Sequence, residues 1–184
     1  IPTSKHVWAV KVPLKIKVFM WFVHKQVILT KDNLIKRNWT GPTRCSFCDR
    51  DETIKHLFFD CPFARVLWRT VHIAFNITPS NSVTTLFGTW LTGIEPELAR
   101  HIRVGVCALL WTIWTCRNDL VFNRTSRIHF LQVIFRATAV IRSWSLLTPM
   151  EAREHLVTGS IRWEMVARDI FNRFGWRSCN RIGN

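Results

Sequence analysis

Four metal-ligating side chains lie within 17 residues of one another, and they constrain the fold of this chain more than any other feature. The string is Cys45-x2-Cys48-x7-His56-x4-Cys61. Three thiolates and one neutral imidazole suit a tetrahedral zinc ion. Because the protein fills all four positions, the spacing predicts a structural zinc site with no place for a catalytic water. The alternative is a group of buried free cysteines.

The residues around these ligands indicate how the four side chains can meet. Cys45 and Cys48 are close enough to bend around one ion in a tight knuckle, and a short helix around 52–59 would carry His56. Cys61 lies five residues further on, too far to share a face of the same α-helix. We therefore expect Cys61 to cap a second helix that begins at Pro62, where the helix dipole favours a thiolate.

Apolar periodicity predicts helices along the rest of the chain, and the expected fold class is mainly α: a small zinc-knuckle module embedded in helices, followed by a helical bundle. In the second helix, capped by Thr30, Leu34 and Ile35 should face inward and the basic residues outward. Ser82 should cap a short helix. The β-branched residues of 12–27 leave a strand as the alternative there. The expected helices are about 12–27, 30–39, 52–59, 62–75, 83–91, 96–122, 128–147 and 160–173.

The stretch 104–114 is nearly all apolar, but it is too short to span a bilayer and is bracketed by Arg103 and Arg117. It predicts a buried central helix that packs against 128–147. The stretch 78–82 is the expected boundary between a zinc-binding module, 7–77, and a helical module, 82–177, which could also pack as one unit. The expected core residues of the central helix are Val104, Leu109, Leu110, Ile113 and Trp114.

Positive charge is concentrated at the start of the chain. The net charge is +14, and residues 1–44 hold nine Lys or Arg against one acid. Such a field favours nucleic acid first and an anionic membrane surface second, and a solvated basic face is the alternative. Phe47 in the knuckle could stack on a base or cover the metal. The candidate nucleic-acid contacts are Lys11, Lys15, Lys17, Lys31, Lys36, Arg37, Arg44 and Phe47.

Cysteine usage and acid content bear on compartment and chemistry. Four of the six cysteines fall in the metal pattern, which favours a reducing compartment. With no early apolar run, we expect an intracellular protein, in nucleus or cytoplasm, without a membrane partner. The twelve acids offer no carboxylate cluster for a nuclease or polymerase, so we expect no enzymatic activity.

The motifs on both sides of the cysteines resemble a known family. They are Val12-Pro-Leu-Lys-Ile-Lys-Val-Phe-Met-Trp21, Leu29-Thr-Lys-Asp-Asn-Leu34 with Arg37, and Glu52-Thr-Ile-Lys-His-Leu-Phe-Phe-Asp-Cys61 with Trp68. Over about 7–75 the chain resembles the reverse-transcriptase zinc-binding domain of plant non-LTR, LINE-type retrotransposons. Further on, Trp111-x2-Trp114-x2-Arg117-Asn118-x3-Phe122 resembles the helical segment that often follows this domain.

This resemblance implies zinc binding at Cys45, Cys48, His56 and Cys61, and an origin in an element whose polymerase copies RNA into DNA. It also implies RNA or DNA as partner, and a reverse transcriptase or another retroelement protein as a further one. The catalytic parts of the parent are missing. A structural or protein-interaction module, with zinc holding the fold, is the alternative function. Whether the chain is a domesticated piece or a decaying copy stays open.

Overall fold

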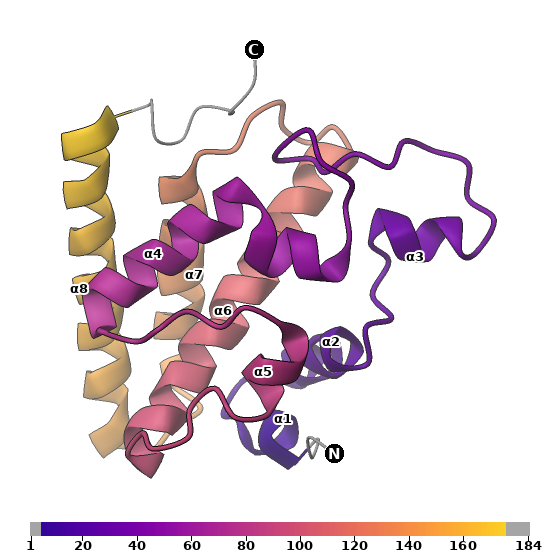
Figure 1. Ribbon diagram of the computed structural model, residues 1–184. Coiled ribbons are helices and arrows are strands. Elements are labelled where there is room, and N and C mark those ends of the chain that lie inside the picture. The colour runs from indigo at the N-terminus through magenta and orange to yellow at the C-terminus, as the bar shows by residue number, and fades with distance from the viewer. Residues whose placement is uncertain (1–4, 176–184) are drawn as a thin grey trace.

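A computed structural model describes residues 5–175, and this part of the chain consists of helices and loops with no strand (Figure 1). The expected mainly α class is confirmed. The last two residues of the expected helical module, 176 and 177, lie outside the described residues. In chain order the elements are α1 (Lys5–Ala9), α2 (Leu14–His24), α3 (Lys31–Ile35), the π-helical turn η1 (His56–Asp60), α4 (Pro62–Phe75), α5 (Val83–Phe87), α6 (Pro96–Val121), α7 (Phe130–Ser145) and α8 (Met150–Phe174).

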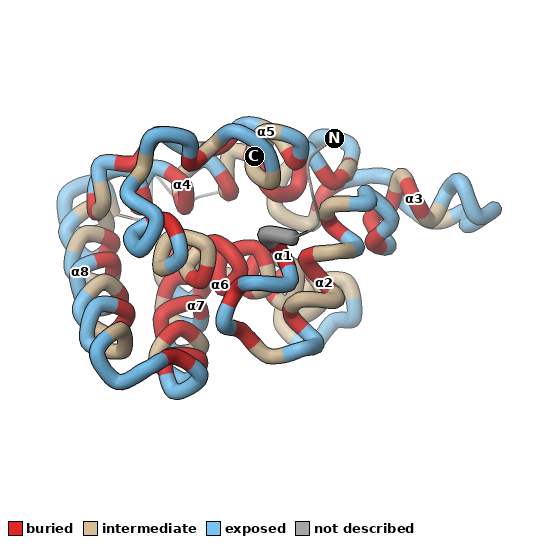
Figure 2. Tube along the Cα trace, turned by 90° about the horizontal axis from the view of Figure 1, so that it is seen from below, coloured by how far each residue is buried: buried red, intermediate tan, exposed pale blue. Residues whose placement is uncertain are grey.

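Three long helices form one side of the molecule. Helices α6, α7 and α8 lie side by side, joined by short loops that make neighbours antiparallel, and α4 packs across α7 and α8 (Figure 1). The start of α7 is fixed by a capping box, in which Gln132 accepts from the backbone of His129 and the His129 ring accepts from the chain in return. Figure 2 shows buried residues along the inner faces of these helices and exposed residues outside.

The central helix α6 is buried as its composition predicts. Val104, Leu109, Leu110 and Ile113 are all inaccessible or nearly so, and they share one core with Ile134 and Ile141 of α7 and apolar residues of α8. None of the helices in the described part of the chain is long and apolar enough to cross a membrane.

Trp114 departs from the expected core, because it is only half-buried. The Arg117 guanidinium lies 5.0 Å from the centre of its ring. A cation over an aromatic face stabilises a tryptophan at the edge of a core, where one side of the ring stays accessible. The neighbouring Trp111 is likewise half-buried, with the Lys15 ammonium 5.8 Å from its ring centre.

The same core extends into the first part of the chain. Ile16, Phe19 and Val23 of α2 are buried, and the Phe19 ring meets the Trp111 ring edge-on at 5.2 Å between centroids. Val27, the last residue of the helix expected over 12–27, is exposed, because α2 ends at His24 and the chain turns. One hydrophobic cluster therefore contains residues from both sides of 78–82.

Helix α1 was not expected, and further helix bounds differ from expectation. Helix α3 ends at Ile35 rather than near Trp39, because Asn38 adopts a left-handed conformation with φ 64°. Helix α5 ends at Phe87 rather than at 91. Helix α8 begins at Met150, ten residues before the expected start at 160. Pro149 precedes its first turn in an extended conformation, so this proline begins α8 as well as following α7.

Candidate metal centre

A tight antiparallel hairpin presents the first two ligands. The Cys45 amide donates to the Arg50 carbonyl at 2.7 Å, the Glu52 amide donates to the Thr43 carbonyl at 2.9 Å, and an isolated bridge lies between these bonds. Within the turn, the Phe47 amide points at the Cys45 sulfur, 3.4 Å away. The knuckle expected from the C-x2-C spacing is therefore closed by backbone hydrogen bonds on both arms.

The π-helical turn η1 supplies the other two ligands. The Cys61 amide donates to the His56 carbonyl at 2.8 Å, an i to i+5 bond in place of the α-helical i to i+4 bond. This wider turn brings residues five apart to one side of the chain, which a regular α-helix would not do. Cys61 then occupies the N-cap position of α4 and Pro62 its first turn, as expected.

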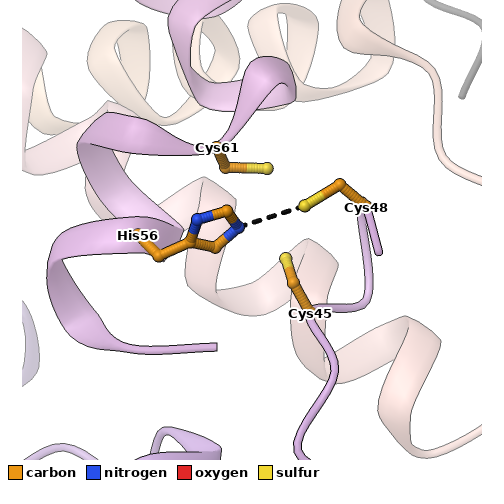
Figure 3. A group of neighbouring side chains, drawn as sticks. All are labelled: Cys45, Cys48, His56 and Cys61. Atoms are coloured by element: carbon orange, nitrogen blue, oxygen red, sulfur yellow. Dashed lines mark hydrogen bonds between the residues drawn. The ribbon is translucent and has the colours of Figure 1, made fainter. Parts of the chain in front are cut away.

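The four side chains converge on one point (Figure 3). Their ligand atoms, three sulfurs and one imidazole nitrogen, all lie within 4.8 Å of one another. The Cys48 sulfur is 3.1 Å from His56 Nε2. With zinc–sulfur bonds of about 2.3 Å, tetrahedral sulfurs stand about 3.8 Å apart, so small shifts would seat an ion. Among residues 5–175 this is the one such group of three or more His, Cys, Asp or Glu side chains.

Burial and hydrogen bonding shift the pKa values of the three thiols in different directions. A hydrogen bond from the Cys61 thiol lowers the pKa of Cys45 to about 4, against the opposing effect of burial. The same bond, burial and the charge of Cys45 raise the pKa of Cys61, and burial raises the pKa of Cys48. Three adjacent thiolates repel one another unless a cation lies between them. The donor set therefore fits a divalent metal that displaces the thiol protons.

Backbone amides also favour sulfur anions here. The amides of Phe47, Arg50 and Phe63 each donate toward a different cysteine sulfur, and each lowers the pKa of that thiol. The Phe63 amide belongs to the first turn of α4, whose dipole acts in the same direction. These donors stabilise negative charge that a zinc–thiolate centre carries on its ligands.

Phe47 is held beside the metal centre. Its ring stacks on the Phe63 ring, with 4.5 Å between centroids and 4° between planes, and both rings pack beside Cys45, Cys61 and Ala64. One face of Phe47 is thus occupied by protein. Of the two roles that the sequence left open, covering the metal agrees with this geometry.

The structure corrects one candidate nucleic-acid contact. Lys31 was expected to face outward, but it is buried and its ammonium donates to the Arg44 carbonyl. Its neighbour Asn33 is also buried, whereas Leu34 is half-buried and Ile35 is exposed. The faces of α3 are therefore reversed from expectation, because polar contacts at the buried side outweigh the apolar residues in so short a helix.

The other basic candidates remain accessible to different degrees. Lys17 is half-buried and donates to the Trp8 carbonyl at 2.8 Å. Lys36 lies 3.9 Å from Asp32, an exposed and weak ion pair. Lys15 is exposed, although its ammonium lies over the Trp111 ring. The exposed candidates with no ion pair among residues 5–175 are Lys11, Lys15, Arg37 and Arg44.

A buried ion pair that the sequence analysis did not assign joins the hairpin to α6. Arg117 donates to both carboxylate oxygens of Glu52, with 2.5 Å from Nη2 to Oε1, and both side chains are almost fully buried. The same carboxylate accepts the Lys31 amide at 3.0 Å, so it caps α3 where the Thr30 side chain does not. Glu52 lies in the motif that ends at Cys61, and Arg117 lies in the motif that begins at Trp111. Nothing in either motif indicates that these two residues pair.

Comparison with known proteins agrees with this centre. Residues 1–68 match the family described as zinc-binding in reverse transcriptase. This match confirms the resemblance inferred from the motifs, and zinc is the ion for the Cys45, Cys48, His56 and Cys61 cluster.

A curated relative extends the comparison. A protein of Arabidopsis thaliana named "Putative ribonuclease H protein" is 31% identical over 62 residues, which cover 33% of this chain and 10% of the relative. The chain thus spans about a tenth of the length of that relative. No solved structure matches the chain.

Proposed function

We propose that this chain is a non-catalytic nucleic-acid-binding module of a retroelement reverse-transcriptase polyprotein, whose zinc ion holds the binding surface in shape. The observation that carries the proposal is a closed Cys3His centre, built by the hairpin and the π-helical turn, with exposed cations such as Arg44 beside its first ligand. The ligands we propose are Cys45, Cys48, His56 and Cys61. RNA or DNA is the proposed partner, and nucleus or cytoplasm the proposed compartment.

The chemistry of the described residues supports a binding role without catalysis. Four protein ligands would leave the metal no open position for water or substrate. Several of the carboxylates that are at least partly buried are engaged by arginines: Glu52 by Arg117, Asp119 by Arg136, and Glu164 by Arg142. Carboxylates neutralised in this way are poor ligands for the divalent ions of nuclease chemistry.

Charge supports nucleic acid as the partner. Lys11, Arg37 and Arg44 are exposed and make no ion pair among residues 5–175, and the chain carries +14 overall. Cations without a protein partner are free to replace counterions along a phosphate backbone. The curated relative is named for ribonuclease H, an activity on nucleic acid, and we extend only the partner class to this chain.

Salt-dependent binding tests the proposal. We expect the zinc-loaded chain to bind RNA or DNA with an affinity that falls as salt rises. Replacing Lys11, Arg37 and Arg44 together by glutamine should reduce the log K against log salt slope by about 0.7–0.9 for each phosphate that the variant no longer neutralises. A matched control removes the same charge elsewhere, with Arg100, Arg127 and Arg162 changed to glutamine, and should keep the wild-type slope. Absence of wild-type binding, or equal slopes for the two triple variants, would overturn the proposal.

One observation favours protein interaction as a second candidate function. An apolar cavity of about 270 Å³ opens between α4, α6 and α8, and half-exposed Leu98 lies at its edge. Apolar pockets of this size take a bulky side chain or a small ligand. Under this alternative the zinc-loaded chain would bind the polymerase region of its parent polyprotein, and filling the cavity by Gly105→Leu would abolish that binding without changing nucleic-acid affinity.

A further inference from the structure

The chain that follows α3 forms an arm on the outside of the molecule. We call residues 36–44 the α3 arm. It reaches away from the long helices on the side of the molecule where α3 lies, and most of it is exposed (Figures 1 and 2). Neither Trp39 nor any other residue of the arm belongs to the hydrophobic core or packs against it. The arm therefore contributes little to burial, and its exposed indole needs another explanation.

Both ends of the arm are fixed to the body. The buried Lys31 ammonium of α3 donates to the carbonyl of Arg44, the last residue of the arm, and so ties that end to α3. Asn33 donates to the carbonyls of Gln26 and Ile28 at 2.9 and 2.8 Å, which holds α3 to the turn after α2. Such contacts reduce the conformational freedom that a ligand would otherwise have to remove on binding.

The indole of Trp39 is positioned within the arm. The Trp39 amide donates to the Leu34 carbonyl at 3.1 Å, across the turn that left-handed Asn38 makes possible. The indole lies against Gly41 so closely that a Cβ on Gly41 would be 1.9 Å from Trp39 Cζ2. Only glycine leaves room for this arrangement, while 36% of Trp39 stays exposed.

Cations flank this indole along the chain. Lys36, Arg37 and Arg44 are exposed, and no acid occurs in the sequence between Asp32 and Asp49. An accessible aromatic ring with cations on either side is the arrangement that binds single-stranded nucleic acid, with the ring stacking on a base and the cations contacting phosphates. A duplex keeps its bases stacked and offers the ring no face, so the arrangement discriminates between the two forms.

We propose that Trp39 is the base-stacking residue of a single-strand binding site on the α3 arm, with Arg37 and Arg44 as its phosphate contacts. This inference rests on the proposed nucleic-acid binding and names its preferred form. Phe47, the aromatic residue of the knuckle, has a face already covered by Phe63. We therefore assign base stacking to Trp39 of the arm and not to Phe47 of the knuckle.

Four variants of the zinc-loaded chain test the inference. Trp39→Ala should weaken single-stranded binding by about fivefold to 150-fold, the decrease expected for one stacked base, and leave duplex affinity and the salt slope unchanged. Trp39→Phe should keep most of the affinity. Gly41→Ala changes no charge but forces the indole from its place, so it should weaken single-stranded binding as well. Trp8→Ala removes another exposed tryptophan, outside the arm, and should behave as wild type.

The outcomes separate this inference from the function on which it rests. If the wild-type chain binds single strands with a salt-dependent affinity and Trp39→Ala binds them equally well, the stacking role is wrong and nucleic-acid binding stands. If the wild-type chain binds neither single strands nor duplex, the proposed function itself fails. Zinc content and far-UV circular dichroism equal to wild type for each variant would exclude unfolding as the cause of weaker binding.

Discussion

The cysteine ligands differ from one another before any metal binds, and this has a consequence for zinc loading. Cys45 favours the thiolate, whereas burial and the neighbouring sulfurs favour the protonated forms of Cys48 and Cys61. Zinc must therefore displace protons to reach its full ligand set, and its affinity should weaken on acidification. The backbone amides aimed at the sulfurs reduce that cost in advance.

Replacing one ligand should remove the ion. We expect Cys48→Ser to lose stoichiometric zinc and to unfold at least residues 40–75, because the energy of metal binding is folding energy in such a module. Zinc content by atomic absorption and helicity by circular dichroism measure the two effects. Cys107→Ala, which removes a thiol outside the cluster, should retain one zinc per chain. A Cys48→Ser protein with full zinc and unchanged helicity would contradict the ligand assignment.

The buried pair of Glu52 and Arg117 gives a second prediction for single residues. Glu52→Gln should lower the free energy of unfolding by about 3–5 kcal/mol, because it leaves a buried guanidinium without its counter-charge. The control is Asp169→Asn, which breaks an exposed pair with Arg173 and should cost less than about 1 kcal/mol. Urea denaturation measures both variants, and equal midpoints for the two would show that the buried pair is not important for stability.

Among the secondary-structure elements, the π-helical turn has the clearest functional reason. A regular α-helix would separate His56 from Cys61 around the helix axis, and the i to i+5 bond brings them together. The turn then passes directly into α4, whose first residues aim an amide at Cys61. The π-helical turn therefore brings His56 and Cys61 together, and it also aims a backbone amide of α4 at the Cys61 sulfur, where the amide stabilises negative charge.

Helices α6 and α8 meet at two histidines whose contact should make stability depend on pH. The rings of His101 and His155 stack at 5.5 Å between centroids. Burial first, and then the charge of His155, lower the pKa of His101, with Glu97 and Glu95 acting in the opposite direction. The folded chain thus binds a proton at His101 less readily than the unfolded chain. Protonation therefore favours the unfolded chain, and the free energy of unfolding decreases as pH falls through about 6.5.

The expected result is a urea midpoint that declines between pH 7.5 and pH 5.5, with a smaller decline in His101→Gln. Zinc content must be measured at each pH, because acid also releases zinc from thiolates. If His101→Gln and wild type lose stability in parallel while both keep zinc, the histidine contact does not contribute to the pH dependence.

For the whole molecule, we propose that the zinc-binding module, 7–77, and the helical module, 82–177, are distinct in sequence but joined in folding. Buried residues from both segments form one cluster, and Phe19 meets Trp111 across the join. The ion pair of Glu52 and Arg117 connects them again over 65 residues of chain. Without the helical module, the zinc-binding module would leave Phe19 and Glu52 unburied, and the reverse holds for Trp111 and Arg117.

Removing zinc should therefore affect the whole described chain. With a chelator present, we expect a single thermal transition at a lower temperature, because unfolding of the hairpin also removes packing and charge partners from α6. Calorimetry with and without chelator measures this, and Cys48→Ser, which should already lack zinc, serves as the control that does not respond. Two transitions, of which the upper one ignores the chelator, would contradict the proposed joining of the modules.

The amino-acid sequence by itself determined the metal ligands, the mainly α class and most helix positions. These depend on spacing and periodicity within short stretches, such as the four-ligand string and the Cys61-Pro62 start of α4, and local geometry is sufficient to predict them. The apolar run of α6 predicted its own burial for the same reason, since only a core accommodates so many adjacent apolar side chains.

Only the tertiary structure decided which polar residues are buried and with which partners. Lys31 lies inside because the Arg44 carbonyl meets its ammonium there, and Glu52 is tolerated at 1% exposure because Arg117 comes from a helix 65 residues away. Likewise, Trp39 lies on Gly41 through a turn at left-handed Asn38. Charge and periodicity along a sequence cannot reveal such partners, because the free energy of burying a polar group depends on what meets it in space.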